Sequence, residues 1–132
     1  AKSFGIDNKI IFHGVLPGGK PVFQWLDSID IYIQPSFQEG LPRAVIEAMS
    51  RGCPVVGSTA GGIPELLDKS YLHKPGDYKM LANIIENIIS NSEFTKKISM
   101  RNFEESKRFK KNILDTKRYN FWSSFVTTFD KK

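Results

Sequence analysis

The amino-acid sequence predicts an α/β fold, a Rossmann-like parallel sheet flanked by helices, and three observations lead to this class. Short apolar runs rich in β-branched residues alternate with helical patterns over residues 1–76. A helical segment separates successive strands, as parallel strands require, because each connection must return to the same end of the sheet. From residue 77 onward the pattern is helical only. We therefore treat residues 1–132 as one domain, in which alternating strands and helices (1–76) precede terminal helices (77–132).

The first predicted strand covers residues 9–15 (KIIFHGV), whose apolar run is typical of a buried strand. A helix is expected over 21–29, because Pro21 suits the first turn of a helix, where its missing N–H group is not needed. Residues 30–36 (DIYIQPS) follow as the second strand, which Pro35 ends.

A second helix is expected over residues 42–52, with Pro42 at its start and Gly52 just past its end. This order of proline and glycine is the usual asymmetry of helix ends. The remaining elements of the first part are a strand, a short helix and a weaker strand, over residues 54–59, 63–68 and 70–74.

Terminal helices are expected over residues 77–90, 92–109 and 116–129. In the first of them, apolar residues recur at spacings of three and four: Leu81, Ile84, Ile85, Ile88 and Ile89. The last helix carries an aromatic face at the same spacing, formed by Tyr119, Trp122, Phe125, Val126 and Phe129. We interpret both stripes as faces that pack on a core. The middle helix is weaker, basic and amphipathic.

The composition is that of an ordinary globular protein, with 40% hydrophobic and 25% charged residues. No apolar run approaches the roughly 18 residues that a membrane-spanning helix needs, so none is expected. Cys53 is the single cysteine, which excludes an internal disulfide and fits a reducing compartment. We therefore expect a cytoplasmic protein, with contact to the inner face of the membrane as an open alternative.

The net charge of +5 is concentrated in the second half of the chain, where residues 67–132 carry fourteen Lys/Arg against eight Asp/Glu. Such a surface can meet anionic lipid, nucleic acid or an acidic partner. A solvated helix face rich in lysine is the favoured interpretation. Nucleic-acid binding is not expected, because the aromatic residues follow core periodicity rather than standing beside the basic run.

Residues 37–66 (FQEGLPRAVIEAMSRGCPVVGSTAGGIPEL) carry the strongest candidate site. Gly40 and Pro42 predict a tight turn after the strand 30–36, and a helix begins there at once. Its unpaired N–H groups and positive dipole end form a ready anion site. Glu39 lies just before this helix and Glu47 about one turn inside, so both carboxylates can line one cleft.

A structural explanation of the two glutamates remains open. Glu39 can simply complement the helix dipole, and Glu47 can pair with Arg43 at i, i+4. Helix periodicity places Ala44 on the buried face, together with Val45, Ala48 and Met49. A second backbone-exposing loop is expected at Gly61-Gly62, after the strand 54–59.

Other motifs are excluded. Residues 14–21 (GVLPGGKP) match the spacing of a phosphate loop, but Pro21 stands where Ser or Thr must hold magnesium. His13 and His73 have no carboxylate or cysteine neighbours at ligand spacing, so no metal site is expected.

Residues 35–67 resemble the signature of retaining nucleotide-sugar glycosyltransferases of the GT-B fold, family 4, which share an E-x7-E motif, here Glu39 to Glu47. The stretches IIFHG before it and HKPGD after it are similar to the family as well. The resemblance covers roughly residues 4 to 110 and implies the carboxyl-terminal, nucleotide-sugar-binding domain. It implies transfer of a hexose-type sugar from a nucleotide-diphosphate donor, in polysaccharide or glycolipid synthesis, with no cofactor and no metal.

The resemblance also implies roles for single residues. Glu39 would contact the transferred sugar close to the reacting carbon, as the catalytic residue, and Glu47 would accept hydrogen bonds from the ribose hydroxyls. The other implied contacts are the backbone of Gly40, Leu41 and Pro42 with sugar hydroxyls, the helix start at Arg43 and Ala44 with the diphosphate, and the loop of Gly14, Val15 and Leu16 with the base.

The chain departs from the family pattern in three ways. Two strands that normally open this domain, the basic Arg and Lys pair between them, and the amino-terminal acceptor-binding domain are all absent from the sequence. We therefore expect an incomplete piece that is inactive on its own, with the strand 9–15 separated from its neighbours. The acceptor, a saccharide or a lipid-linked saccharide, cannot be read from these residues. The alternative function is a nucleotide-sugar-binding fragment or module with no transfer activity.

Overall fold

The computed structural model describes residues 1–129, with side chains described through residue 126. Within this range the strands β1 (Tyr32–Gln34), β2 (Val55–Ser58) and β3 (Leu72–His73) form a parallel sheet in the order β1-β2-β3. The helices are α1 (Lys20–Leu26), α2 (Arg43–Ser50), α3 (Tyr78–Ser90), α4 (Ser92–Ser106) and α5 (Lys111–Phe129). Short 3-10 turns cover Lys2–Phe4, Asp7–Lys9, Ile63–Glu65, Lys69–Tyr71 and Lys107–Phe109.

The core lies on both faces of the central strand β2. Adjacent residues of a strand point to opposite faces, so Val55 and Val56 enter different apolar clusters. The cluster around Val55 is formed mainly with α1, α2 and the segment after β2, and includes Leu26, Val45, Met49, Ile63 and Leu66. The cluster around Val56 is formed with α3 and α4, and includes Tyr71, Ile84, Ile88 and Ile98. The predicted fold class, a parallel sheet flanked by helices, is confirmed.

Helix α2 lies within the range that the sequence predicts and is slightly shorter, from Arg43 to Ser50. Pro42 is its N-cap residue, in extended backbone conformation, so the helix starts one residue later than expected. Gly52, just past its end, has a φ of 71°, a conformation that glycine adopts without strain. Of the residues expected on the buried face, Val45, Ala48 and Met49 are fully buried, whereas Ala44 is exposed. The expectation for Ala44 was wrong.

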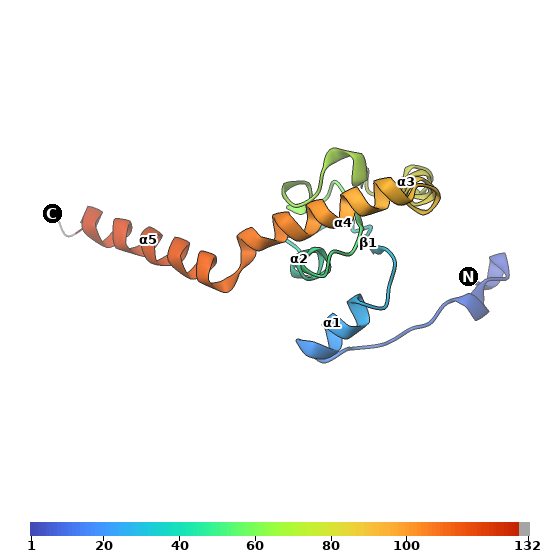
Figure 1. Ribbon diagram of the computed structural model, residues 1–132, viewed down its shortest axis with the longest axis horizontal. Coiled ribbons are helices and arrows are strands. Elements are labelled where there is room, and N and C mark those ends of the chain that lie inside the picture. Colours follow the sequence, from blue (N-terminus) through green and yellow to red (C-terminus); the bar gives the residue numbers. More distant parts are fainter. Residues whose placement is uncertain (130–132) are drawn as a thin grey trace.

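The predicted strand over residues 9–15 is wrong. Residues 10–16 lie outside any helix or strand, and Phe12 and Val15 are 92% and 97% exposed. A β-strand requires hydrogen bonds to a neighbouring strand, and no described residue supplies one here. Figure 1 shows this segment running from the start of α1 toward the amino terminus, apart from the sheet.

The elements after β2 are shorter than expected. The predicted helix 63–68 is a single 3-10 turn, Ile63–Glu65. The predicted strand 70–74 shrinks to β3, because a 3-10 turn occupies the residues before it. Asp68 caps that turn by accepting the N–H of Ser70 at 3.0 Å.

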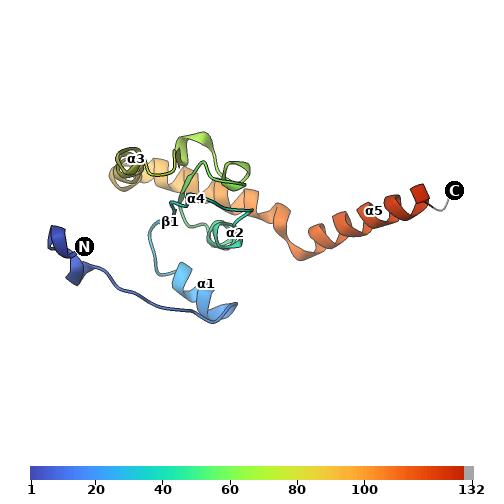
Figure 2. The ribbon, with the colours of Figure 1, turned by 180° about the vertical axis from the view of Figure 1, so that it is seen from behind.

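Two predicted core stripes differ from the structure. In α3, Ile84 and Ile88 are buried as expected, but Ile89 is 73% exposed. The aromatic face of α5 is exposed rather than buried, at Tyr119, Trp122, Phe125 and Val126. The side chain of Phe129 lies outside the described residues. Figures 1 and 2 show the reason: the end of α5 that carries these residues extends beyond the rest of the domain.

Among the helices of residues 1–129, none combines the length and the apolar character that crossing a membrane requires.

Candidate functional site

The candidate site lies at the carboxyl ends of β1 and β2, where the loop from residue 35 to residue 42 leads into α2. The backbone N–H of Gly62, in the loop after β2, donates a 2.7 Å hydrogen bond to the carbonyl oxygen of Gly40. At Gly61, whose φ is 52°, an added Cβ would collide with the carbonyl of Glu39. Both glycines therefore allow the loop after β2 to lie directly against residues 39–41.

A hydrogen-bond network holds the carboxylate of Glu39. Its Oε1 accepts from Nε2 of Gln34 at 2.7 Å and from Oγ of Ser36 at 2.8 Å. The Gln34 amide also donates to Oγ of Ser36 at 2.9 Å. The hydroxyl of Tyr32 donates to Oε1 of Gln34 at 2.8 Å, which turns the NH₂ end of that amide toward Glu39. Glu39 is therefore positioned by residues of the preceding strand and loop.

The electrostatic environment of Tyr32 links the two glutamates. Burial raises the pKa of the Tyr32 phenol above its ordinary value, and the negative charges of Glu39 and Glu47 raise it further. The hydroxyl of Tyr32 is joined to Glu39 through the Gln34 amide, and Tyr32 and Glu47 line the same cavity. The expectation that both carboxylates line one cleft stays a prediction, because Glu39 is not among the residues that line the cavity of Glu47 described next.

Glu47 lines a cavity of about 250 Å³ between α1, α2 and the extended segment that precedes α1. Four predicted site residues meet there: Gly14, Leu16, Ala44 and Glu47. The cavity is completed by His13, Val22, Trp25, Leu26 and Tyr32. The rings of His13 and Trp25 are in edge contact, with centroids 6.0 Å apart. Most of this lining is apolar or aromatic, which suits a flat heterocycle, and Glu47 supplies a carboxylate.

The start of α2 is available to an anion. No side chain caps its first N–H groups, so these donors lack the partner that a Ser, Thr or Asp cap would provide. Arg43 Nε donates to Glu47 Oε1 at 2.9 Å, and the Arg43 side chain is 89% exposed. The Glu47 side chain is 23% exposed, and an i, i+4 ion pair on a helix is worth a few tenths of a kcal/mol. The sequence left this i, i+4 pair open, and the structure shows it. The pair is weak enough for Arg43 and Glu47 to exchange each other for groups of a ligand.

A second, larger cleft of about 930 Å³ lies on the other side of Glu47, between α2 and the residues that lead into α5. Arg43, the first residue of α2, and Glu47, one turn further along, both line this cleft. Its basic lining residues are Lys107, Lys110, Lys111 and Arg118, and its apolar ones include Phe23, Leu41, Ile46, Phe103, Phe109 and Leu114.

One predicted site residue stands apart from the others. Val15, expected beside the base, is 97% exposed and does not line the cavity that Gly14 and Leu16 share. Sequence reasoning missed Tyr32, Gln34 and Ser36, which hold Glu39. Their signal was the period of two along the strand, which places Tyr32 and Gln34 on one face. Trp25 was also missed as a cavity residue.

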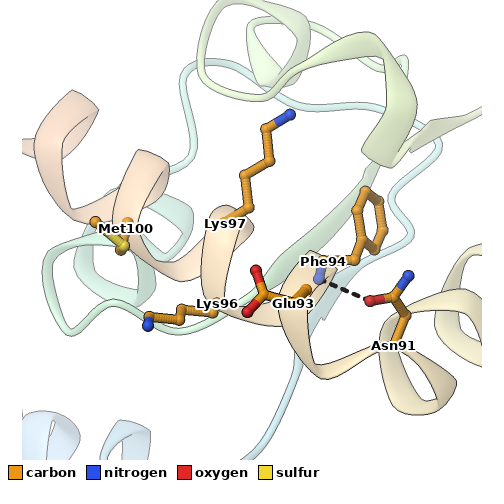
Figure 3. Close-up of a pocket in the computed structure, with 6 residues that line it drawn as sticks. All are labelled: Asn91, Glu93, Phe94, Lys96, Lys97 and Met100. Carbon is orange, nitrogen blue, oxygen red and sulfur yellow. Dashed lines mark hydrogen bonds between the residues drawn. The ribbon is translucent and has the colours of Figure 1, made fainter.

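Figure 3 shows another hollow, of about 530 Å³, at the start of α4. Lys96 and Lys97 line it, but their side chains point away from each other. The side-chain oxygen of Asn91 is occupied, because it accepts the N–H of Phe94 at 3.0 Å and so caps the helix. These groups do not converge on a common point, and we assign no site there.

Residues 1–91 match the protein family described as "Glycosyl transferases group 1". Among curated proteins, the chain is 34% identical to Protein CapJ of Staphylococcus aureus over 113 residues, which covers 86% of this chain and 27% of CapJ. The chain thus spans about a quarter of the length of that relative.

Solved structures share the fold. The complex of Anabaena Alr3699/HepE with UDP has a TM-score of 0.84 and 30% identity, over 93% of this chain and 34% of that protein. The same protein has also been solved in complex with UDP-glucose. The C-terminal domain of the group 1 glycosyl transferase LpcC from Francisella tularensis has a TM-score of 0.74 and 28% identity, over 83% of this chain and 58% of that one.

Proposed function

Because the chain belongs to the group 1 glycosyltransferase family, we propose that it supplies the donor-binding part of a retaining glycosyltransferase. The donor is a nucleotide-diphosphate sugar of the hexose type, and the acceptor is a saccharide or a lipid-linked saccharide. Support comes from the likeness to HepE, which was solved with UDP and with UDP-glucose, and to the C-terminal domain of LpcC.

The nucleoside is proposed to occupy the cavity between α1 and α2. The base would lie against Gly14 and Leu16, where the backbone and an apolar side chain offer a flat wall, with Trp25 close by. The ribose would lie beside Glu47, because a carboxylate accepts both hydroxyl protons of a vicinal diol at once. Ala44, exposed and small, leaves room between the nucleoside and α2.

The diphosphate is proposed to lie at the start of α2. The uncapped N–H groups of the first turn point toward such an anion, and the helix dipole favours negative charge there. Arg43 would leave Glu47 and pair with a phosphate oxygen, while the ribose takes its place on Glu47. During transfer the bond from sugar to diphosphate breaks, and these fixed donors stabilise the charge that builds up on the leaving group.

The sugar is proposed to lie against the loop of Gly40, Leu41 and Pro42, with backbone groups contacting its hydroxyls. Glu39 would contact the sugar near the reacting carbon, where positive charge develops as the leaving group departs. Its carboxylate is held by Gln34 and Ser36 before any ligand binds. A carboxylate fixed in this way stabilises developing positive charge without first having to reorganise.

The observation that carries this proposal is the meeting of Gly14, Leu16, Ala44 and Glu47 in one cavity beside an uncapped helix start. These residues come from two segments some thirty positions apart in the chain. Neither segment alone would indicate a nucleoside site.

Calorimetric titration of the chain with UDP and with UDP-glucose tests the proposal. Glu47→Gln should weaken both ligands by roughly 30-fold, because a charged hydrogen-bond acceptor is worth about 2 kcal/mol. Glu86→Gln, an exposed position on α3, is the matched control and should bind as the wild type does. Equal affinity of the wild type and Glu47→Gln would refute the ribose assignment.

A further inference from the structure

The chain bends between α4 and α5, and this bend contacts the loop that follows β2. The 3-10 turn Lys107–Phe109 follows α4, and Lys110 then leaves helical conformation with a ψ of 142°. Figures 1 and 2 show the resulting change of direction. At the bend, the guanidinium of Arg108 donates through Nη2 to the backbone carbonyl of Glu65. These two residues are 43 positions apart in the chain, so their contact joins the bend to the loop after β2.

Arg108 is restrained by its own surroundings. Its Nη1 lies 3.5 Å from Oε2 of Glu105, one turn earlier. Its guanidinium carbon lies 4.9 Å from the centroid of the Phe109 ring, and Phe109 packs partly buried against the cluster around Val55. A guanidinium carries five N–H donors in a rigid fork, so one cation can serve a carboxylate and a carbonyl together. The bond to Glu65 therefore comes from a side chain that two further contacts restrain, although Arg108 is 44% exposed.

The Glu65 carbonyl belongs to a line of hydrogen bonds that ends at Gly40. Glu65 closes the 3-10 turn Ile63–Glu65. The last carbonyls of a helical turn have no partner within it, and Arg108 supplies one here. The N–H of Glu65 donates to the carbonyl of Gly62 at 3.1 Å, and the N–H of Gly62 donates to the carbonyl of Gly40 at 2.7 Å. Three hydrogen bonds in line therefore connect the Arg108 guanidinium to Gly40.

Side-chain packing joins the same two regions. We call residues 40–42, where the sugar is proposed to lie, the sugar loop. Leu41 of this loop lines a hollow of about 250 Å³ together with Arg108 and Glu65. An added Cβ at Gly62 would lie only 3.0 Å from Cδ1 of Leu41, so the loop after β2 and the sugar loop are in close contact. Because closely packed groups transmit strain, a movement of Glu65 displaces the sugar loop.

We propose that Arg108 is a positioning residue, which holds the sugar loop in place through the loop after β2. Arg108 lines neither the cavity of Glu47 nor the larger cleft beside it, so it acts from outside the donor site. A loop that contacts sugar hydroxyls binds best when its groups are already in place, because ordering them on binding costs affinity. The inference rests on the proposed function for one point, that a sugar binds at residues 40–42.

Hydrogen exchange of single backbone amides, measured by NMR on the ligand-free chain, tests the positioning role. Such exchange reports local opening of the structure. In Arg108→Met the Gly62 N–H should exchange roughly 5-fold faster than in the wild type, because the loop loses a hydrogen bond from a charged donor. The N–H of Tyr32, which donates to the carbonyl of Pro54 at 2.9 Å, is the internal reference and should exchange as before.

Two further variants separate the contacts of Arg108. Glu105→Gln removes its ion pair but leaves its bond to the Glu65 carbonyl, so the exchange of Gly62 should stay within about 2-fold of the wild type. Arg108→Lys keeps a cation that can donate to one carbonyl, and it should restore most of the protection that Arg108→Met loses. A general loss of stability would instead speed up exchange at Gly62 and at Tyr32 alike.

Titration with UDP and with UDP-glucose extends the test to the ligand. Arg108→Met should weaken UDP-glucose roughly 5-fold, while UDP, which lacks the sugar, should bind as it does to the wild type. A structural role would weaken both ligands equally.

The inference is overturned by unchanged exchange of Gly62 in Arg108→Met, or by an equal increase at Gly62 and Tyr32. Equal loss of affinity for UDP and UDP-glucose, or full affinity of the variant for UDP-glucose, contradicts it as well. If the wild type binds neither ligand, the proposed function fails, and the exchange of Gly62 still decides whether Arg108 holds the loop.

Discussion

The side-chain amide of Gln34 donates a 2.7 Å hydrogen bond to the carboxylate of Glu39, five residues further along the chain. Gln34 ends β1, and Glu39 stands in the loop that leads to α2. Tyr32 fixes the orientation of the Gln34 amide from the other side. The strand therefore determines where the Glu39 carboxylate points, and this dependence can be measured.

Replacement of Gln34 by leucine should loosen Glu39, and Gln34 itself does not line the nucleoside cavity. On the proposed roles, UDP-glucose loses affinity by roughly 10-fold, because one hydrogen bond to a charged group is removed, while UDP binds as before. Titration of the Gln34→Leu variant with both ligands gives the ratio of the affinity for UDP-glucose to the affinity for UDP. Gln24→Leu, an exposed position on α1, is the control. Equal loss for UDP and UDP-glucose would contradict a role confined to the sugar.

Replacement of Arg43 by glutamine tests the proposed diphosphate contact. The affinity for UDP should fall roughly 10-fold, because a charged partner of the phosphates is lost. Uridine has no phosphate, so its affinity should stay the same or rise slightly as Glu47 is freed from its ion pair. Titration of wild type and Arg43→Gln with the two ligands provides an internal control. A parallel decrease for uridine would show that Arg43 acts on the fold rather than on phosphate.

Gly61 should not tolerate a side chain. Its φ of 52° and its closeness to the Glu39 carbonyl mean that Gly61→Ala pushes two loops apart. We expect a loss of about 2 kcal/mol in the free energy of unfolding, from strained backbone and a displaced loop. Gly18→Ala is matched, because nothing lies within 4 Å of its added Cβ, and it should change stability by less than about 0.5 kcal/mol. Urea unfolding of both variants measures the two changes. Similar midpoints would contradict the close contact between Gly61 and the carbonyl of Glu39.

Cys53 gives a prediction about pH. Burial raises the pKa of its thiol from 9.0 to about 11, so the folded protein keeps the proton longer than the unfolded chain does. The stability that this thiol contributes is complete below about pH 9 and is lost as the pH rises from 9 toward 11, by about 1.4 kcal/mol per pH unit. In the Cys53→Ala variant, the free energy of unfolding should fall less steeply between pH 9 and pH 11. Urea unfolding of both proteins at several pH values in this range measures the difference. Curves of equal slope for the two proteins would contradict the buried thiol.

The sheet and α2 could be predicted because their signals are local. The apolar run around Val55 and Val56, and the Pro42 and Gly52 boundaries of α2, specify each element without reference to distant residues.

Other expectations failed where a partner decides the outcome. Residues 9–15 have the composition of a strand, but a strand forms only where a neighbouring strand accepts and donates its backbone hydrogen bonds. No strand among the described residues pairs with this segment. Periodicity shows that α5 has an aromatic side, yet it cannot show what covers that side. Ala44 sits at a buried position of the helical repeat but borders a cavity instead of core.

The candidate site was predicted through its two glutamates, and their supporting residues were not. Tyr32 and Gln34 lie on one face of a strand only three residues long, too short for the alternation to stand out. The roles of Glu39 and Glu47 toward a ligand stay predictions.

The central claim is that a nucleotide-sugar donor binds between the extended segment that precedes α1 and the start of α2. Backbone amide shifts of the ¹⁵N-labelled chain, recorded by NMR with UDP and then with UDP-glucose, test it most directly. We predict that UDP moves the signals of Gly14, Leu16, Ala44 and Glu47, and that the glucose moiety adds shifts at Glu39, Gly40 and Leu41. Shifts confined to other surfaces, such as the hollow at the start of α4, or none at saturating UDP, would contradict the account.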